Sequence, residues 1–283
     1  MNDSFHIGLF VNPTRENARA LQLAHATINL LKEKNLQYSL HIDPWPKTLD
    51  NFSQAWIIGG DGTINWFVNQ YPDANIPLAV FSGGSGNDFH WMIYGESNVK
   101  EQLEKILQAI PVKVDAGICN GRIFMNGVGI GFDGAIVHDL LGKKKLAGKA
   151  SYLLSILKHI VSYREKECSI QLSAESIQQP CFMISVANAR RYGGGFMVAP
   201  RASLADGLLD INIVGRIPPL KRIKYLPVME KGEHLELPFI QYRHADHVII
   251  QAHEKLHAHI DGEYIYEERF DISILPGRFS FLY

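Results

Sequence analysis

The feature that most constrains the fold is an alternation of short apolar runs with segments of helical periodicity over the first 110 residues. In one such segment Ala18, Leu21, Ala24, Ile28 and Leu31 recur at spacings of three and four, as on an amphipathic helix. Strands alternating with helices indicate a parallel sheet with helices on its faces. The predicted strands are residues 5–11, 36–42, 55–58 and 77–81, and the predicted helices are residues 16–34, 63–71 and 98–110.

The pattern changes near Asp115. The pair Asn120-Gly121 lies between apolar residues, which is typical of a type I′ hairpin turn. Helical periodicity follows over residues 135–162. We therefore predict an α/β protein of two domains, an α/β domain over residues 1–114 and a mainly antiparallel β domain over residues 115–272, and the final segment, 273–283, could complete the first domain. The strands predicted in the second domain are residues 168–172, 182–187, 208–214, 247–252 and 256–260.

Composition limits the kinds of partner. The chain has 28 basic and 29 acidic residues and a net charge of −1, whereas wholesale nucleic-acid binding requires a strong basic excess. Its three cysteines are an odd number without CxxC spacing, which argues against a disulfide framework or a structural zinc site. The most apolar helical stretch, residues 146–161, contains Lys149, Lys158 and His159 and is not a membrane span. No signal peptide is visible, and we expect a cytoplasmic protein.

Two glycine-rich loops follow predicted strands of the first domain. Gly59-Gly60-Asp61-Gly62-Thr63 follows one strand, and Gly83-Gly84-Ser85-Gly86-Asn87-Asp88 follows the next. Consecutive N–H groups in such a loop can bind an anion, and a helix N-terminus after the loop favours phosphate. Asp61 would repel an anion and makes sense beside a divalent cation or a substrate hydroxyl. One loop alone could be a plain strand-to-helix turn, but two at one sheet edge indicate a ligand site.

These loops resemble the paired motifs of the diacylglycerol kinase catalytic-domain family, which includes bacterial diacylglycerol kinases and sphingosine and ceramide kinases. The likeness extends over nearly the whole chain. Several positions depart from the family pattern: Trp66 stands where the family has Glu, and Ser82, Ser85 and His90-Trp91 also differ. The further matching segments are Asn12-Pro13, residues 129–133, residues 192–195, Ala199-Pro200 with Ala202, residues 206–210 and residues 259–263.

The resemblance implies a two-domain ATP-dependent lipid kinase, with diacylglycerol as the foremost substrate. It implies that Mg²⁺ is held by the side chain of Asp206 and the carbonyls of Ser203 and Leu208, an all-oxygen set that suits this ion. From the residues alone, Asp206-Gly207 would be taken as a turn. The positions implied to bind nucleotide are Asn12, Gly59, Gly60, Asp61, Gly62, Thr63, Gly84, Ser85, Asn87 and Asp88.

Three carboxylates compete for the catalytic role. We expect Glu263 to be the general base, because burial near a lipid cleft would raise its pKa toward neutrality, with Asp261 as structural or metal-linked support. Asp61 is the alternative, since the sphingosine kinase branch assigns the base to the motif Asp. The sequence leaves the choice open.

Other features leave alternatives. His253, Lys255, His257, His259 and Asp261 share strand parity, which favours a polar face over a metal site. The run Lys143-Lys144-Lys145 fits either a solvated face or contact with anionic headgroups at the inner face of the membrane. An NAD kinase-like enzyme and a non-catalytic nucleotide- or lipid-binding regulator are the rival functions. A homodimer is a fair expectation.

Overall fold

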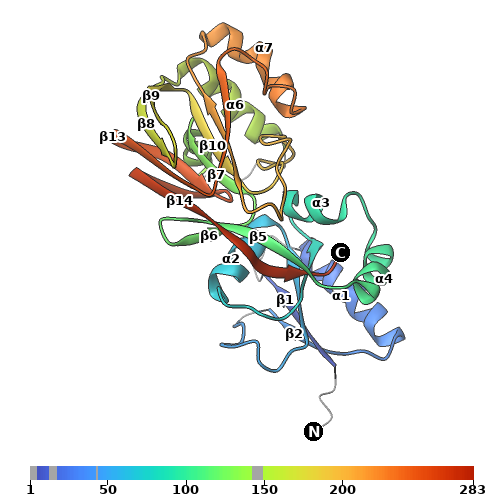
Figure 1. Ribbon diagram of the computed structural model, residues 1–283. Helices are drawn as coiled ribbons and strands as arrows, with labels where there is room; N and C mark the ends of the chain where they lie inside the picture. Colours follow the sequence, from blue (N-terminus) through green and yellow to red (C-terminus); the bar gives the residue numbers. More distant parts are fainter. Residues whose placement is uncertain (1–4, 13–17, 43, 142–148) are drawn as a thin grey trace. The chain divides into compact units, whose positions relative to one another are not determined.

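The computed structural model describes residues 5–12, 18–42, 44–141 and 149–283. It divides into two compact units (Figure 1). Unit 1 comprises Met1–Val114 and Gly277–Tyr283, and unit 2 comprises Asp115–Pro276. The run Lys143-Lys144-Lys145 lies outside the described residues.

Unit 1 contains a parallel sheet in the order β4-β3-β1-β2. Its register pairs Gly59 with Ser82, so that the two glycine loops leave neighbouring strands at the same sheet edge. The end of the chain adds to this sheet, because Phe281 pairs in parallel with Leu78. The strands are β1 (His6–Val11), β2 (Gln37–His41), β3 (Gln54–Gly59) and β4 (Leu78–Ser82).

Four helices belong to unit 1: α1 (Ala18–Glu33), α2 (Asp61–Gln70), α3 (Asp88–Tyr94) and α4 (Val99–Gln108). The sequence patterns predict all of them except α3. That helix has only seven residues, too few for a periodicity to be visible. It forms because Phe89 and His90 are buried, and because the His90 ring hydrogen-bonds Gln102 of α4, with 3.1 Å between Nε2 and Oε1.

Unit 2 is mainly antiparallel. Strands β12, β11, β10, β7, β13 and β14 pair in that order, with β8 on β13 and β9 on β8. The hairpin predicted at Asn120-Gly121 is confirmed, since both residues have positive φ. The strands are β5 (Val112–Cys119), β6 (Arg122–Phe124), β7 (Gly127–Gly131), β8 (Lys166–Leu172), β9 (Ser176–Cys181), β10 (Met183–Ala187), β11 (Leu209–Val214), β12 (Ile240–Ala245), β13 (His247–Ile260) and β14 (Glu263–Phe281).

Some strand predictions for unit 2 are corrected. The segments 247–252 and 256–260 form one strand, β13, whose register against β14 shifts between Gln251 and Leu256. The expected polar face over residues 253–261 is wrong in part, because His253 is exposed whereas His259 and Asp261 are buried. The apolar pattern does not predict strands β9 and β12, because about half of their residues are polar.

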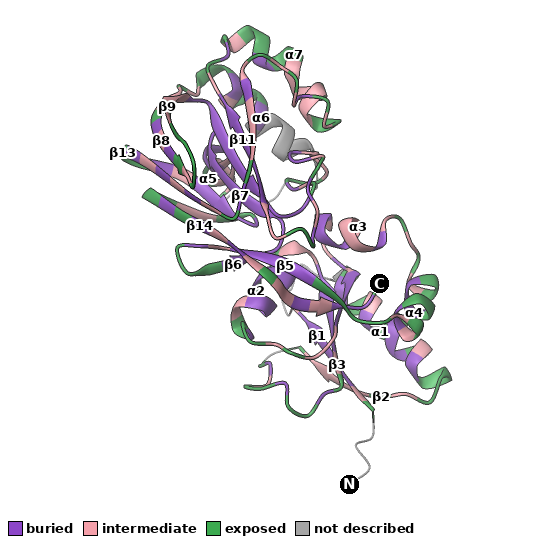
Figure 2. Cartoon of the chain, viewed as in Figure 1, coloured by how far each residue is buried: buried purple, intermediate pink, exposed green. Residues whose placement is uncertain are grey.

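Three helices cover part of unit 2: α5 (Phe132–Leu140), α6 (Lys149–Ser162) and α7 (Pro219–Glu230). Figure 2 shows buried residues concentrated in the strands and exposed residues along α7. Arg222 joins the two longer helices, since its guanidinium donates to the carbonyls of Ile160 (2.9 Å) and Tyr163 (2.8 Å) and to Glu165 Oε1 (2.6 Å). Among the described residues no helix is long and apolar enough to span a membrane.

The strands of the β5–β6 hairpin yield a test of packing. A Cβ at Gly117 would lie 1.9 Å from Cζ of Phe124, whose ring is fully buried and would have to shift. We expect Gly117→Ala to lower the free energy of unfolding by about 1–3 kcal/mol in urea titrations, as overpacking does. Gly215→Ala is the control, because its Cβ would be 3.4 Å from the nearest atom, the carbonyl oxygen of Phe239. Equal stability of the two variants would contradict the expectation.

Candidate functional site

The two glycine loops of unit 1 pack against each other backbone to backbone. A Cβ at Gly60 would lie 2.9 Å from both Cα of Gly84 and the carbonyl oxygen of Gly86, and a Cβ at Gly84 would lie 2.4 Å from Cα of Gly60. A hydrogen bond of 2.8 Å from Gly83 N to Gly59 O closes the pair. The glycines are therefore required by the close contact between the two loops, because a side chain at Gly60 or Gly84 would overlap the opposite backbone.

Asp61 and Asn87 hold this pair of loops in shape. The Asp61 carboxylate accepts the backbone N–H of Asp88 (3.1 Å) and of Phe89 (2.9 Å), which are the first two residues of α3. The Asn87 side chain bridges the backbone of Gly84, accepting from its N–H at 3.0 Å and donating to its carbonyl at 3.1 Å. A carboxylate on a helix N-terminus is stabilising, so Asp61 has a structural reason besides any catalytic one.

The other positions implied to bind nucleotide differ in exposure. Thr63 and Asp88 are buried, and Thr63 lies directly beneath Gly59. Gly62 and Ser85 are exposed, and Asn12 is half-buried at the end of β1. An anion meeting these loops would therefore find the backbone around Gly62 and the hydroxyl of Ser85 first.

Trp66, where the family pattern has Glu, belongs to an aromatic cluster. Its ring lies 4.3 Å, centroid to centroid, from that of Trp45, and the Trp45 indole donates to the carbonyl of Val11 at 3.2 Å. In place of the family's carboxylate, this chain has a pair of tryptophan rings tilted by 36° to each other near the end of β1. Sequence reasoning missed this cluster, although the aromatic residues near 41–71 were a visible signal.

The residues implied to hold a metal lie on one turn of unit 2. Asp206 is exposed, and its Oδ1 accepts from Leu208 N at 3.1 Å, which fixes the turn. The buried Asp115 supports the turn, accepting from Gly207 N at 2.8 Å and donating its own N–H to Leu204 O at 2.7 Å. Carboxylate and carbonyl oxygens are the ligand types that Mg²⁺ prefers, so the residue types of this turn are compatible with that ion. Sequence reasoning missed Asp115, which belongs to no motif.

Asp261 is a structural carboxylate. It is buried and accepts three backbone N–H groups, those of Met125 (2.8 Å), Asn126 (2.9 Å) and Gly127 (2.9 Å). Its own N–H donates to the carbonyl of Gly127 at 3.0 Å. The turn between β13 and β14 is thereby tied to the start of β7.

This turn carries Glu263 at its far side. Gly262 N donates to Nδ1 of His259 at 3.2 Å, and both Asp261 and Gly262 have positive φ, as the turn requires. Glu263 itself is exposed. The burial expected for this carboxylate is therefore not found within unit 2.

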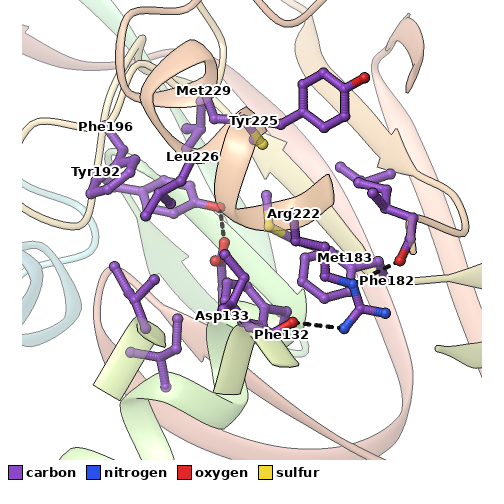
Figure 3. A pocket seen from close by; sticks show the side chains of 16 residues that line it. Phe132, Asp133, Phe182, Met183, Tyr192, Phe196, Arg222, Tyr225, Leu226 and Met229 are labelled. Atoms are coloured by element: carbon purple, nitrogen blue, oxygen red, sulfur yellow. Dashed lines mark hydrogen bonds between the residues drawn. The ribbon is translucent and has the colours of Figure 1, made fainter. Parts of the chain in front are cut away.

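Unit 2 contains a mostly apolar cavity with about 620 Å³ of empty space, part of it open to solvent. Asp133, at the start of α5, is an acidic group in its lining, and Tyr192 donates to Asp133 Oδ2 at 2.7 Å (Figure 3). Arg222 also lines it, but its charge is paired with Glu165. The remaining lining residues are Phe132, Ile136, Ile156, Ile160, Phe182, Met183, Phe196, Val198, Val214, Ile217, Tyr225, Leu226 and Met229.

Two titratable groups beside this cavity are shifted in opposite directions. Burial raises the pKa of Asp133 to about 6, opposed by the hydrogen bond from Tyr192. Burial lowers the pKa of His259 to about 4. The two side chains flank Gly129, where a Cβ would lie 2.5 Å from His259 Nε2 and 2.9 Å from Asp133 Oδ2. The sequence shows Asp133 and Tyr192 only as parts of two separate motifs, and it does not predict that they meet at a cavity.

Comparison with known proteins identifies the family. Residues 6–119 match the diacylglycerol kinase catalytic domain, and residues 126–283 match the YegS C-terminal NAD kinase beta sandwich-like domain, which is more than half of the chain. A diacylglycerol kinase of Bacillus subtilis (strain 168) is 30% identical over 239 residues, covering 83% of this chain and 77% of the relative. The chain belongs to the diacylglycerol kinase family of lipid kinases.

Further relatives agree. A diacylglycerol kinase of Mycobacterium tuberculosis (strain ATCC 25618 / H37Rv) is 26% identical, over 96% of this chain and 93% of the relative. A crystal structure of a diacylglycerol kinase from Bacillus anthracis str. Sterne superposes with a TM-score of 0.69 at 21% identity, over 98% of this chain and 96% of that one, and shows the same fold. The predicted fold class, an α/β catalytic domain with a β-sandwich-like second domain, is confirmed.

The opposed shifts in this lipid kinase predict a pH test. Burial favours neutral Asp133, and its contribution to stability is lost as pH rises from about 4 to 6. Burial also favours neutral His259, and its contribution to stability is lost as pH falls from about 6.5 to 4. The two effects offset each other in the wild type. As pH rises from 4 to 6, we expect urea titrations to show the free energy of unfolding of Asp133→Asn increasing by about 2–3 kcal/mol relative to wild type. That of His259→Gln should decrease by about the same amount over the same range. Parallel pH profiles for all three proteins would contradict it.

From the hydrogen bonds of the turn at Asp261 we predict that two variants of this kinase differ in stability. Asp261→Asn replaces a carboxylate that accepts three buried N–H groups, and we expect the free energy of unfolding to fall by about 2–4 kcal/mol. Glu263→Gln, two residues away and exposed, is the matched control and should change it by less than about 0.5 kcal/mol. Equal free energies of unfolding for the two variants would show that the three hydrogen bonds do not stabilise this turn.

Proposed function

We propose that this lipid kinase transfers the γ-phosphate of ATP to the hydroxyl of diacylglycerol, giving phosphatidate. The mostly apolar cavity of unit 2 is the observation that carries the proposal, because acyl chains need an apolar lining and such a cavity would not suit a charged dinucleotide. The printed descriptions of the relatives from Bacillus subtilis and Mycobacterium tuberculosis support the choice of diacylglycerol.

Asp133 gives the cavity a polar end for the lipid headgroup. With a pKa near 6 its carboxyl exchanges protons close to neutrality, and Tyr192 fixes the orientation of Oδ2. The hydrogen-bonded pair of Asp133 and Tyr192 within a mostly apolar lining would orient a glycerol backbone while the acyl chains fill the rest. This is the arrangement expected for a neutral lipid with a single free hydroxyl.

The glycine loops of unit 1 would bind ATP. We assign the phosphates to the backbone of residues 59–63 and 84–85, with Asn12, Asn87 and Asp88 completing the nucleotide site and Asp61 and Asn87 keeping the loops together. Mg²⁺ would be held by Asp206 with the carbonyls of Ser203 and Leu208, and would neutralise phosphate charge when bound. Gly60 and Gly84 serve the loops by their lack of a side chain.

We assign the general base to Glu263. Its carboxylate is exposed, and the turn that presents it is held by Asp261 through three hydrogen bonds and by His259 through one. The carboxylate of Asp61, by contrast, already accepts two backbone N–H groups of α3. Asp261 is the support that the sequence suggested rather than a group that meets substrate.

The experiment that tests the function is phosphorylation with γ-labelled ATP. A panel of diacylglycerol, ceramide, sphingosine and phosphatidylglycerol in mixed micelles, with NAD as a water-soluble acceptor, is resolved by thin-layer separation. We expect label in the chloroform phase and in phosphatidate. Label in NAD would favour the NAD kinase-like alternative, and ATP binding without any labelled product would favour a regulator. The cytoplasmic, membrane-peripheral location and the homodimer remain parts of this proposal.

Two further variants test the assigned residues. Glu263→Gln should lower kcat by about 10²–10⁴-fold with normal melting and ATP binding, whereas Asp61→Asn should lose stability and ATP affinity together. Loss of kcat alone in Asp61→Asn, with normal turnover in Glu263→Gln, would transfer the base to Asp61.

The cavity is tested by filling it. Met229→Trp should lower kcat/KM for a long-chain diacylglycerol by roughly tenfold or more, because the indole occupies the space assigned to an acyl chain. Val228→Trp is the control, since Val228 is the neighbouring residue on α7 and is not part of the lining. Unchanged kcat/KM in both variants would separate the cavity from the substrate.

A further inference from the structure

Helix α7 is apolar on two faces. Its inner face contributes Tyr225, Leu226 and Met229 to the cavity. On its outer face Leu220 is 83% exposed and Ile223 is 45% exposed, and their spacing of three places them side by side. A helix that is covered on one side only has no structural use for large apolar residues on the other.

The same outer face is basic. Lys221 and Lys224 are exposed between and beside the two apolar residues, and Arg216 is exposed just before the helix. No acidic residue occurs from residue 215 to residue 229. The end of α6 has a similar character, with Leu157 and Val161 exposed and Arg164 exposed just beyond it.

Arg222 makes this a firm surface. It points inward and ties the start of α7 to the end of α6 through the carbonyls of Ile160 and Tyr163 and through Glu165. Because the buried Arg222 and its carboxylate partner neutralise each other, the charge that remains outside over residues 215–229 is that of Arg216, Lys221 and Lys224.

We propose that the α7 surface, defined as Arg216, Leu220, Lys221, Ile223 and Lys224, docks on a bilayer containing anionic phospholipid. Exposed apolar side chains between cations are the pattern that enters the headgroup region of such a bilayer. A second copy of this chain is a poor occupant, because it would bring three cations against three cations. The proposal rests on the proposed function: the helix that touches the bilayer with one face lines the lipid cavity with the other.

The experiment is sedimentation of the full chain with two kinds of vesicle. One contains phosphatidylcholine alone, and the other also contains roughly 30 mol% phosphatidylglycerol, which gives the membrane a negative surface potential. We expect wild type to bind the anionic vesicles. Leu220→Ser with Ile223→Ser, and separately Lys221→Gln with Lys224→Gln, should each lower the partition coefficient by about tenfold or more. Added salt should reduce wild-type binding toward that of the lysine variant.

Matched controls come from unit 1. Ile110 is 82% exposed, so Ile110→Ser removes an equally exposed apolar residue elsewhere, and Lys100→Gln with Lys105→Gln removes two exposed lysines of α4. These controls should bind as wild type does. Failure of wild type to bind the anionic vesicles, or equal binding by the α7 variants and wild type, would overturn the proposal.

A second measurement separates this proposal from the proposed function. With monomeric dioctanoylglycerol no bilayer is needed, and the α7 variants should turn over at the wild-type rate while losing activity on vesicles. Absence of any lipid product, with vesicle binding still lost in the variants, would refute the function and leave the docking surface. A concentration-dependent dimer that Leu220→Ser with Ile223→Ser abolishes would overturn the bilayer in favour of a second copy.

Discussion

The carboxylate of Asp261 is the interaction on which much of unit 2 depends. It gathers three backbone N–H groups of residues 125–127, where β6 ends and β7 begins, onto a turn more than 130 residues later in the chain. A buried carboxylate is costly unless it is well hydrogen-bonded, and here the backbone supplies the bonds. The turn is therefore held at one position, and with it the exposed Glu263.

In unit 1 two loops are held together mainly by contact between their backbones. Its two loops approach so closely that a Cβ at Gly60 or Gly84 would overlap the backbone of the other loop. Asp61 then connects the first loop to the start of α3, and Asn87 closes the second loop on itself. The close contact of the loops is thus a packing requirement, and a substitution in them must be judged by its effect on stability as well as on ligand binding.

The cavity of unit 2 combines apolar volume with the carboxyl of Asp133, and His259 lies on the other side of Gly129; burial favours the neutral form of both groups. Asp133 and His259 are both shifted toward neutrality, from opposite directions, around Gly129. Neutral groups cost less in an apolar surrounding, so the cavity can keep hydrogen-bonding capacity without a net charge. That property suits a neutral lipid.

The sequence by itself determined the features that depend on neighbours along the chain. Alternating periods predicted the α/β part, the Asn120-Gly121 pair predicted a hairpin, and the order of motifs identified the family. Only the tertiary structure decided how distant residues meet. It buried His259 and left Glu263 exposed, placed Arg222 between α6 and α7, and put Asp133 beside Tyr192. Burial and hydrogen-bond partners are set by residues tens of positions away, and periodicity within one segment contains no information about them.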